Sequence, residues 1–165
     1  MNNNTANTLA DAFESVRNLT KFYFSKLDDK YYHNENIINE VKINNAFWIL
    51  AHLVWTEHSL IIYGIGNREM EIPWLDKYSF GSNPELIESE PSLEEVRDKF
   101  EKVHIIAMEI IRNLTDEQLE EDNHLGATFG SSKSKKSLLM HAIRHEPMHV
   151  GQLSLILKSN GVKLT

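Results

Sequence analysis

The sequence predicts an all-α protein that folds as a four-helix bundle, and three observations lead to this fold class. Apolar residues recur every three or four positions in long segments, which is the spacing of one helix face. Almost no segment alternates apolar and polar residues as a β-strand would. The chain has 165 residues, enough for one domain with its own core. We therefore expect a single bundle domain over residues 1–165.

The first two helices are predicted from their apolar residues. In the first, expected over about residues 5–27, the apolar stripe steps by four and three. This stripe consists of Leu9, Phe13, Val16, Thr20, Tyr23 and Leu27. The second helix lies in NNAFWILAHLVWTEHSLIIYGIG and should end near Gly64. Because this segment is apolar on most faces, the second helix should be buried and central.

The third and last helices carry signals at their ends. Ser92 should cap the helix in SLEEVRDKFEKVHIIAMEIIRNL, and the Glu95 side chain should reach back to the cap in a capping box. The last helix, in SLLMHAIRHEPMHVGQLSLILKSNG, should begin at a cap on Ser134 or Ser137. An Asn-Gly pair at 160–161 should end it.

Long loops are expected after the second and third helices, over about residues 65–91 and 115–136. Loops of this length inside a compact domain are usually functional or mobile. The first of them contains Trp74. This loop should either fold over a site or be pinned to the body of the protein by Trp74.

The composition narrows the range of partners. With 24 acidic and 17 basic residues, the chain has a net charge of -7 and should be repelled by phosphate backbones and anionic membranes. We therefore expect no nucleic-acid and no membrane partner. The N-terminal MNNNTANTLADAF lacks the basic start and apolar run of a secretory signal, so a cytoplasmic location is expected. Since the chain has no cysteine, His, Asp and Glu would hold any metal.

Three histidines recur at four-residue intervals in the last helix. His141, His145 and His149 share one helix face, and Gln152 lies on the same face. The face is apolar before and after them, so these polar groups should point into the bundle. Buried polar groups need partners, and a bound metal would satisfy two or three of them. A hydrogen-bonded histidine ladder without metal is the alternative.

The segment HEPMH, residues 145–149, is also a literal H-E-x-x-H, the pattern of zinc proteases. Pro147 argues against that interpretation, because proline in a helix removes a backbone hydrogen bond and clashes with the preceding turn. The longer form of the pattern needs Gly at 152 and His at 155, where this chain has Gln152 and Leu155. A zinc protease is therefore not predicted.

A third metal ligand is expected from the second helix. His52 shares a face with Trp48 and Thr56, whereas His58 points about 120° away. Catalytic zinc sites typically have three protein ligands and one open position. The predicted ligands are therefore His52, His145 and His149. Four neighbours are predicted to support the ligands or line a pocket: His141, Gln152, Trp48 and Thr56.

The segments AHLVWTE and HAIRHEPMHVGQL together resemble the DinB-like superfamily, also called the YfiT-like metal-dependent hydrolases. The resemblance covers essentially the whole chain. Its specific part is one histidine on the second helix followed by H-x-x-x-H-x-G-Q, here residues 145–152. It implies a four-helix bundle, often dimeric, with a divalent ion, zinc or nickel, on His52, His145 and His149. Pro147 departs from the family pattern, and a kink there would reshape the site.

The resemblance also implies a function. It favours a metal-dependent enzyme of small molecules, either a thiol S-transferase acting with a low-molecular-weight thiol or a hydrolase. A non-catalytic bundle that binds metal or a small ligand is one alternative, and a structural, dimerising bundle without metal is another. The sequence indicates no general base, because Glu57 and Glu146 are expected to be solvated charges on helix exteriors.

Overall fold

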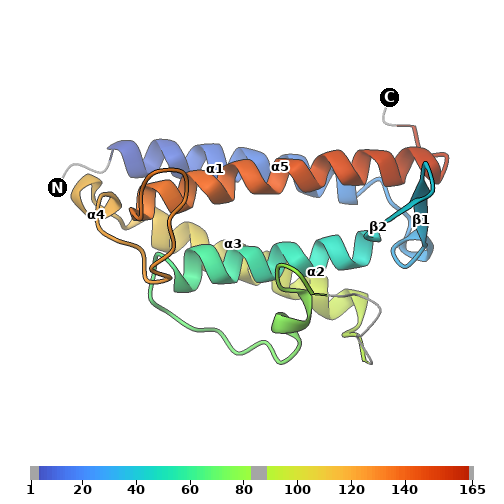
Figure 1. The fold of residues 1–165 in the computed structure, drawn as a ribbon, viewed down its shortest axis with the longest axis horizontal. Coiled ribbons are helices and arrows are strands. Elements are labelled where there is room, and N and C mark those ends of the chain that lie inside the picture. The colour runs from blue at the N-terminus through green and yellow to red at the C-terminus, as the bar shows by residue number, and fades with distance from the viewer. Residues whose placement is uncertain (1–3, 83–88, 164–165) are drawn as a thin grey trace.

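The computed structural model describes residues 4–82 and 89–163. Its body consists of four long helices, which confirms the predicted all-α bundle (Figure 1). They are α1 (Asn4–Phe24), α2 (Ala46–Glu57), α3 (Leu93–Arg112) and α5 (Lys135–Ser159). Helix α1 packs on α5 and α3, and α2 packs on α3 and α5. Each helix therefore lies against two others around one core. Among the described residues, no helix has the length and apolar character needed to cross a membrane.

Helix α2 is the central helix, as predicted. All of its residues except Trp55 are buried. It continues directly into a π-helical segment, η2 (His58–Tyr63), which is followed by Gly64. A side chain at Gly64 would meet Leu138 of α5 at 2.7 Å, so glycine allows the end of this helix to approach α5 closely. Segments of π-helix are frequently found at functional sites.

The buried face of α1 differs from the predicted stripe by about one residue. Its buried positions include Phe13, Arg17 and Phe24, whereas Val16 and Tyr23 are only half-buried. The prediction was wrong here because an arginine was not counted as a core residue. Arg17 has no exposed surface, so the face that packs on α5 and α3 runs through a charged side chain.

The helix ends follow the sequence signals with one exception. Ser92 accepts a hydrogen bond from the Glu95 amide at 3.1 Å, and Ser134 accepts one from the Ser137 amide at 3.2 Å. Helix α5 is capped at Asn160, and Gly161 follows with a positive φ of 74°. The Glu95 carboxylate, predicted to complete the capping box, instead accepts a hydrogen bond from Trp74 Nε1 at 2.7 Å. This bond ties the loop to α3.

The loop between α2 and α3 is folded onto the bundle. Trp74 is 5 % exposed, which confirms that it pins this loop. A 3₁₀ helix, η3 (Leu75–Tyr78), follows it and packs on α2. Residues 83–88 of the predicted loop lie outside the described residues. The second predicted loop contains the short helix α4 (Asp116–Leu119).

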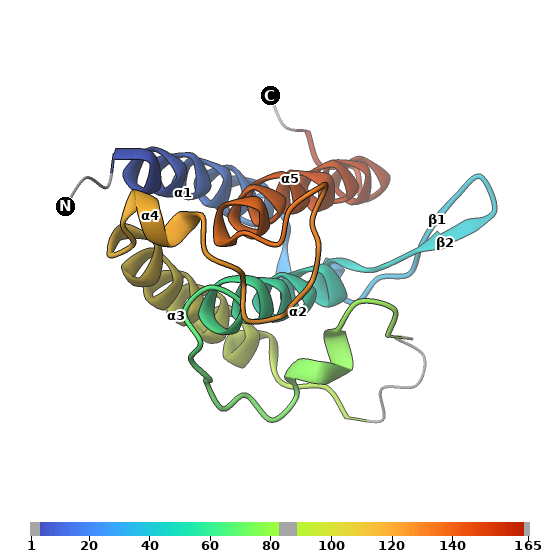
Figure 2. The ribbon, with the colours of Figure 1, turned by 60° about the vertical axis from the view of Figure 1, so that its left-hand side comes forward.

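A β-hairpin between α1 and α2 was not predicted. Strands β1 (Asn36–Ile38) and β2 (Val41–Ile43) pair antiparallel and project from the bundle (Figure 2). The two residues between them have positive φ angles, 49° and 67°, as in the turns that suit two-residue hairpins. Strands this short carry too little alternation to be recognised from sequence.

Candidate metal centre

Three histidines from two helices meet inside the bundle. His52 lies in the middle of α2, and His145 and His149 lie one turn apart on α5. Each offers one ring nitrogen, and these three nitrogens lie within 4.8 Å of one another. His52 and His149 are buried, and His145 is half-buried. We call these three residues the histidine centre.

Two of the three rings are held by oxygen acceptors on their far side. His52 Nδ1 lies 2.7 Å from the backbone carbonyl oxygen of Tyr78, and His149 Nδ1 lies 2.9 Å from Gln152 Oε1. Because these oxygens can only accept, Nδ1 of each ring carries the proton and donates it. Nε2 of His52 and of His149 is then unprotonated, which is the state in which a ring nitrogen binds an ion.

The spacing of the nitrogens fits a metal ion better than a hydrogen bond. His149 Nε2 lies 3.4 Å from His145 Nε2, which is long for an N–H···N bond. Two imidazole nitrogens bound tetrahedrally at about 2.0–2.1 Å would be roughly 3.3–3.4 Å apart. Nδ1 of His145 is buried without a hydrogen-bond partner among the described residues, so no acceptor there orients this nitrogen. The donor set fits a divalent ion such as zinc or nickel.

The electrostatics of the histidine centre keep it neutral. Burial lowers the pKa of His52 to about 4, although its bond to Tyr78 acts in the opposite direction. Burial, reinforced by the neighbouring histidines, lowers the pKa of His145 to about 3. Burial also lowers the pKa of His149. All three rings are therefore neutral at pH 7, the form in which imidazole binds metals.

A sequence model of the DinB superfamily matches residues 12–153. The chain belongs to the DinB superfamily. The match covers most of the chain and includes both segments on which the predicted resemblance was based. Together with the histidine centre, membership fits a metal-binding helical protein. The comparison with curated proteins gave no match.

The four residues predicted to support the ligands or line a pocket lie around the histidine centre. The Trp48 ring stacks on His52 with centroids 4.6 Å apart, and Thr56 Oγ1 lies 3.4 Å from His52 Nε2. Gln152 contacts His149 as described above. His141 lies at the edge, with its ring centroid 5.7 Å from that of His145 and its Nδ1 bonded to Arg144 Nη2. Trp55, which also flanks His52, adds a second aromatic wall.

The prediction that Glu57 and Glu146 are solvated was wrong. They are 2 % and 3 % exposed, and both contact Arg17. Glu146 lies on a helix that packs on α1, and Glu57 lies between the side chains of Arg17 and His104. The signal for this was Arg17 itself, which lies four residues after Phe13 and seven before Phe24 of α1. Glu146 is therefore not available as the base that its place in the H-E-x-x-H pattern suggests.

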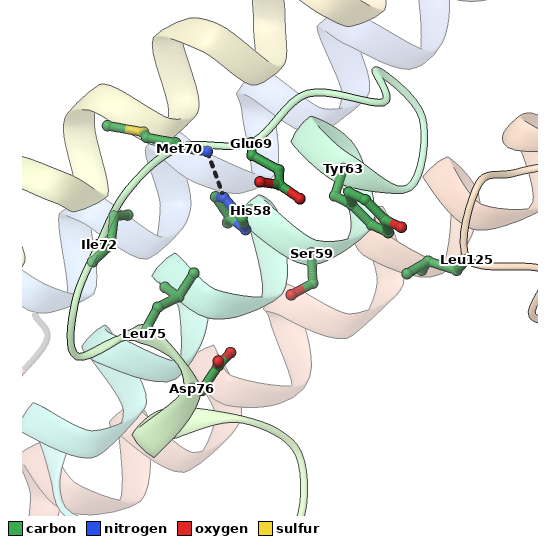
Figure 3. Close-up of a pocket in the computed structure, with 9 residues that line it drawn as sticks. All are labelled: His58, Ser59, Tyr63, Glu69, Met70, Ile72, Leu75, Asp76 and Leu125. Carbon is green, nitrogen blue, oxygen red and sulfur yellow. Dashed lines mark hydrogen bonds between the residues drawn. The ribbon is translucent and has the colours of Figure 1, made fainter.

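A separate pocket of about 360 Å³ lies at the η2 end of α2 (Figure 3). His58 and Ser59 face it from the helix, and Asp76 lines it from η3. None of the three histidines of the centre lines this pocket. His58 Nε2 accepts a hydrogen bond from the Met70 amide at 3.1 Å, so His58 holds the loop. The two sites are joined through η3, since the carbonyl of Tyr78 holds His52.

Proposed function

We propose that this DinB-superfamily protein is a metal-dependent enzyme of small molecules, in which His52, His145 and His149 hold one divalent ion. The observation that carries the proposal is the convergence of three neutral imidazoles, two of them with Nδ1 engaged by oxygen acceptors. When bound, such an ion polarises a substrate and lowers the pKa of a thiol or water ligand.

We further propose that the reaction is thiol transfer, with hydrolysis as the alternative. In hydrolysis by the H-E-x-x-H pattern, a glutamate serves as base. Here Glu146 is occupied by Arg17, and no carboxylate of the described residues joins the histidine centre. A thiol has an ordinary pKa of about 8.5, against about 15.7 for water, so it needs less help from a base. The missing base therefore penalises hydrolysis more than thiol transfer.

In this reaction the sulfur of a low-molecular-weight thiol forms a bond to the electrophilic carbon of the second substrate. The leaving group departs from that carbon with its bonding electrons, and the thiol proton goes to solvent. The protein contributes by orienting the substrates and by lining the site with side chains that exclude water. The rings of Trp48 and Trp55 both stack on His52 and give the site apolar surface. Such surfaces exclude water and strengthen the electrostatic interactions inside the site.

Elemental analysis of protein purified without added metal or chelator tests the ligand set. Wild type should contain about one divalent ion per chain, and His52→Ala and His149→Ala should contain none while their circular dichroism stays helical. His58→Ala is the matched control, because His58 comes from the same helical segment but bonds the Met70 amide. Full metal content in His149→Ala, or no metal uptake by wild type, would contradict the proposal.

The reaction is tested on the loaded protein. Zinc- or nickel-loaded wild type should accelerate the displacement of bromide from bromobimane by glutathione, and His149→Ala should not. Loaded wild type that hydrolyses nitrophenyl esters but leaves the thiol unreacted would favour the hydrolase. Loaded protein that does neither would favour a non-catalytic binding module. The predicted homodimer stays a prediction, which light scattering would test.

A further inference from the structure

Next to the histidine centre, each of the four long helices contributes one ionisable side chain to a buried group. These are Arg17 from α1, Glu57 from α2, His104 from α3 and Glu146 from α5, and all are at most 4 % exposed. We call this group the Arg17 cluster. Glu146 directly follows the predicted ligand His145, so the cluster and the histidine centre share one turn of α5.

Arg17 holds Glu146 by two contacts. Arg17 Nη2 donates to Glu146 Oε2 at 3.1 Å, and Arg17 Nε lies 3.0 Å from Glu146 Oε1. The same Nη2 also donates to Glu57 Oε2, while Nη1 donates to the Phe100 carbonyl at 3.2 Å. The guanidinium is thus fixed from three sides. The contact with Glu146 is one hydrogen bond and one ion-pair contact, since Arg17 Nε and Glu146 Oε1 have no hydrogen-bond partner among the described residues. Together they restrict where the Glu146 carboxylate can lie.

The turn that Arg17 holds lacks part of its own backbone support. Pro147 has no N–H, so the carbonyl of Ile143 loses its usual helical donor within this turn. Helix α5 nevertheless continues without interruption from Lys135 to Ser159. Proline inside a helix commonly produces a kink, and a kink here would move His145 relative to His149.

We propose that Arg17, acting through Glu146, is a positioning residue that sets the separation of His145 and His149. The inference rests on the proposed metal site and extends it to α1, which holds none of the predicted ligands. In this view the contact with Arg17 substitutes for the backbone bond that Pro147 removes. Stability alone does not explain why the protein has such a cluster, because buried ion pairs can often be replaced by apolar residues without loss of folding stability.

Glu146→Gln and Glu57→Gln form the matched pair that tests the inference. Both oxygens of Glu146 lie against the guanidinium of Arg17, so the amide nitrogen introduced by Glu146→Gln would replace one of them next to a positive charge. The amide introduced by Glu57→Gln can point its oxygen at Arg17 and its nitrogen at His104 Nδ1, which lies 2.7 Å from Glu57 Oε1. His104 can accept there because its proton can move to Nε2, which lies 3.2 Å from Glu14 Oε2. Both variants remove one buried charge, but Glu146→Gln alone alters the turn that carries two ligands.

Zinc affinity, measured by competition with a chromogenic chelator, is the main readout. We expect Glu146→Gln to weaken zinc binding by about tenfold or more and Glu57→Gln by less than about threefold. Equal losses in the two variants, or no loss in Glu146→Gln, would overturn the inference. If Glu146→Gln does not fold, Glu146→Asp keeps the charge but shortens the reach, and it should lose affinity while Glu57→Asp does not.

Replacement of the proline tests the reason for the effect. Pro147→Ala restores an N–H for the Ile143 carbonyl, so Glu146→Gln should cost less than about threefold in affinity in that background. The same loss in both backgrounds would overturn the role of Pro147.

A wild type that takes up no zinc would contradict the proposed function, and the inference would then be judged on the metal-free proteins. There, Glu146→Gln should shift the ¹⁵N resonances of Nε2 in His145 and His149, and Glu57→Gln should leave them in place. Unchanged resonances in Glu146→Gln would overturn the inference.

Discussion

The histidine centre and the Arg17 cluster are both polar groups buried around the same turn of α5, yet they are satisfied in different ways. In the Arg17 cluster every charge meets an opposite charge, and the guanidinium also bonds a backbone carbonyl. In the histidine centre the acceptors hold the Nδ1 sides of His52 and His149, and the Nε2 sides converge on one another. Among the described residues, Arg17 Nε and Glu146 Oε1 in the first group and His145 Nδ1 in the second all lack a hydrogen-bond partner. In the first group the opposite charges face each other, whereas the second group has no countercharge and is suited to a ligand.

The same burial therefore has opposite effects on ionisation in the two regions. Burial alone would lower the pKa of Arg17, but Glu57 and Glu146 together outweigh it and raise the pKa. In the histidine centre the neighbours of His145 are other histidines, so burial prevails and the pKa falls. The charge state of a buried side chain is thus decided by the charge of its neighbours and not by how deeply it is buried. This is why one region serves as architecture and the other is suited to holding a cation.

The largest effect is expected from breaking the Arg17 cluster. Arg17→Met leaves Glu57 and Glu146 buried without a cation, so the free energy of unfolding should fall by about 3–5 kcal/mol. Urea unfolding followed by circular dichroism measures it. Arg112→Met is the control, because the ion pair between Arg112 and Asp11 is exposed and should contribute less than about 1 kcal/mol. Equal losses in both variants would show that burial does not distinguish these pairs.

Acidification should affect the histidine centre instead. The folded pKa of His52 is about 4, below its ordinary 6.5, so between these values the unfolded chain binds more protons than the folded one. The contribution of neutral His52 to the free energy of unfolding should therefore be fully present above about pH 6.5. As the pH falls toward 4, the free energy of unfolding should decrease by on the order of 3 kcal/mol because of His52.

Urea unfolding of the metal-free protein at a series of pH values measures this loss. His52→Ala removes the titrating ring, so the fall in stability between pH 6.5 and 4 should be shallower in that variant. Parallel curves for variant and wild type would assign the pH dependence to other groups.

Most of the fold could be predicted because helix signals are local. The caps at Ser92 and Ser134 and the stop at Asn160 depend on a few neighbouring residues. The hairpin could not be predicted, because three-residue strands have almost no periodicity and the turn at Asn39 contains no glycine. The Glu95 side chain was misplaced because its partner, Trp74, comes from a distant loop.

In the candidate site, too, one part could be predicted from the sequence and another could not. The histidine face of α5 was predictable, since residues four apart on a helix share a face whatever surrounds them. The Arg17 cluster was not, because a helical wheel gives the direction of Glu146 but not which helix covers it. That information lies in the packing of α1 on α5, which only the tertiary structure provides. Whether His52, His145 and His149 bind metal stays a prediction.

The smallest effect is expected at the rim of the histidine centre and concerns Gln152. Gln152 is exposed, but its Oε1 fixes the proton of His149 on Nδ1. Gln152→Leu removes this acceptor, so zinc affinity should fall by about 10–100-fold with little change in stability. Gln152→Glu keeps an acceptor oxygen and should bind zinc within about threefold of wild type.

Chelator competition compares these two variants under one condition. His52 permits no such experiment, because its acceptor is the Tyr78 backbone carbonyl, which no side-chain substitution removes. If Gln152→Leu binds zinc as tightly as wild type, then Nδ1 of His149 does not need an acceptor. His145, whose Nδ1 has no hydrogen-bond partner within residues 4–82 and 89–163, would then be typical of this site, and the bound ion, not the protein, would set which ring nitrogen of each histidine carries the proton.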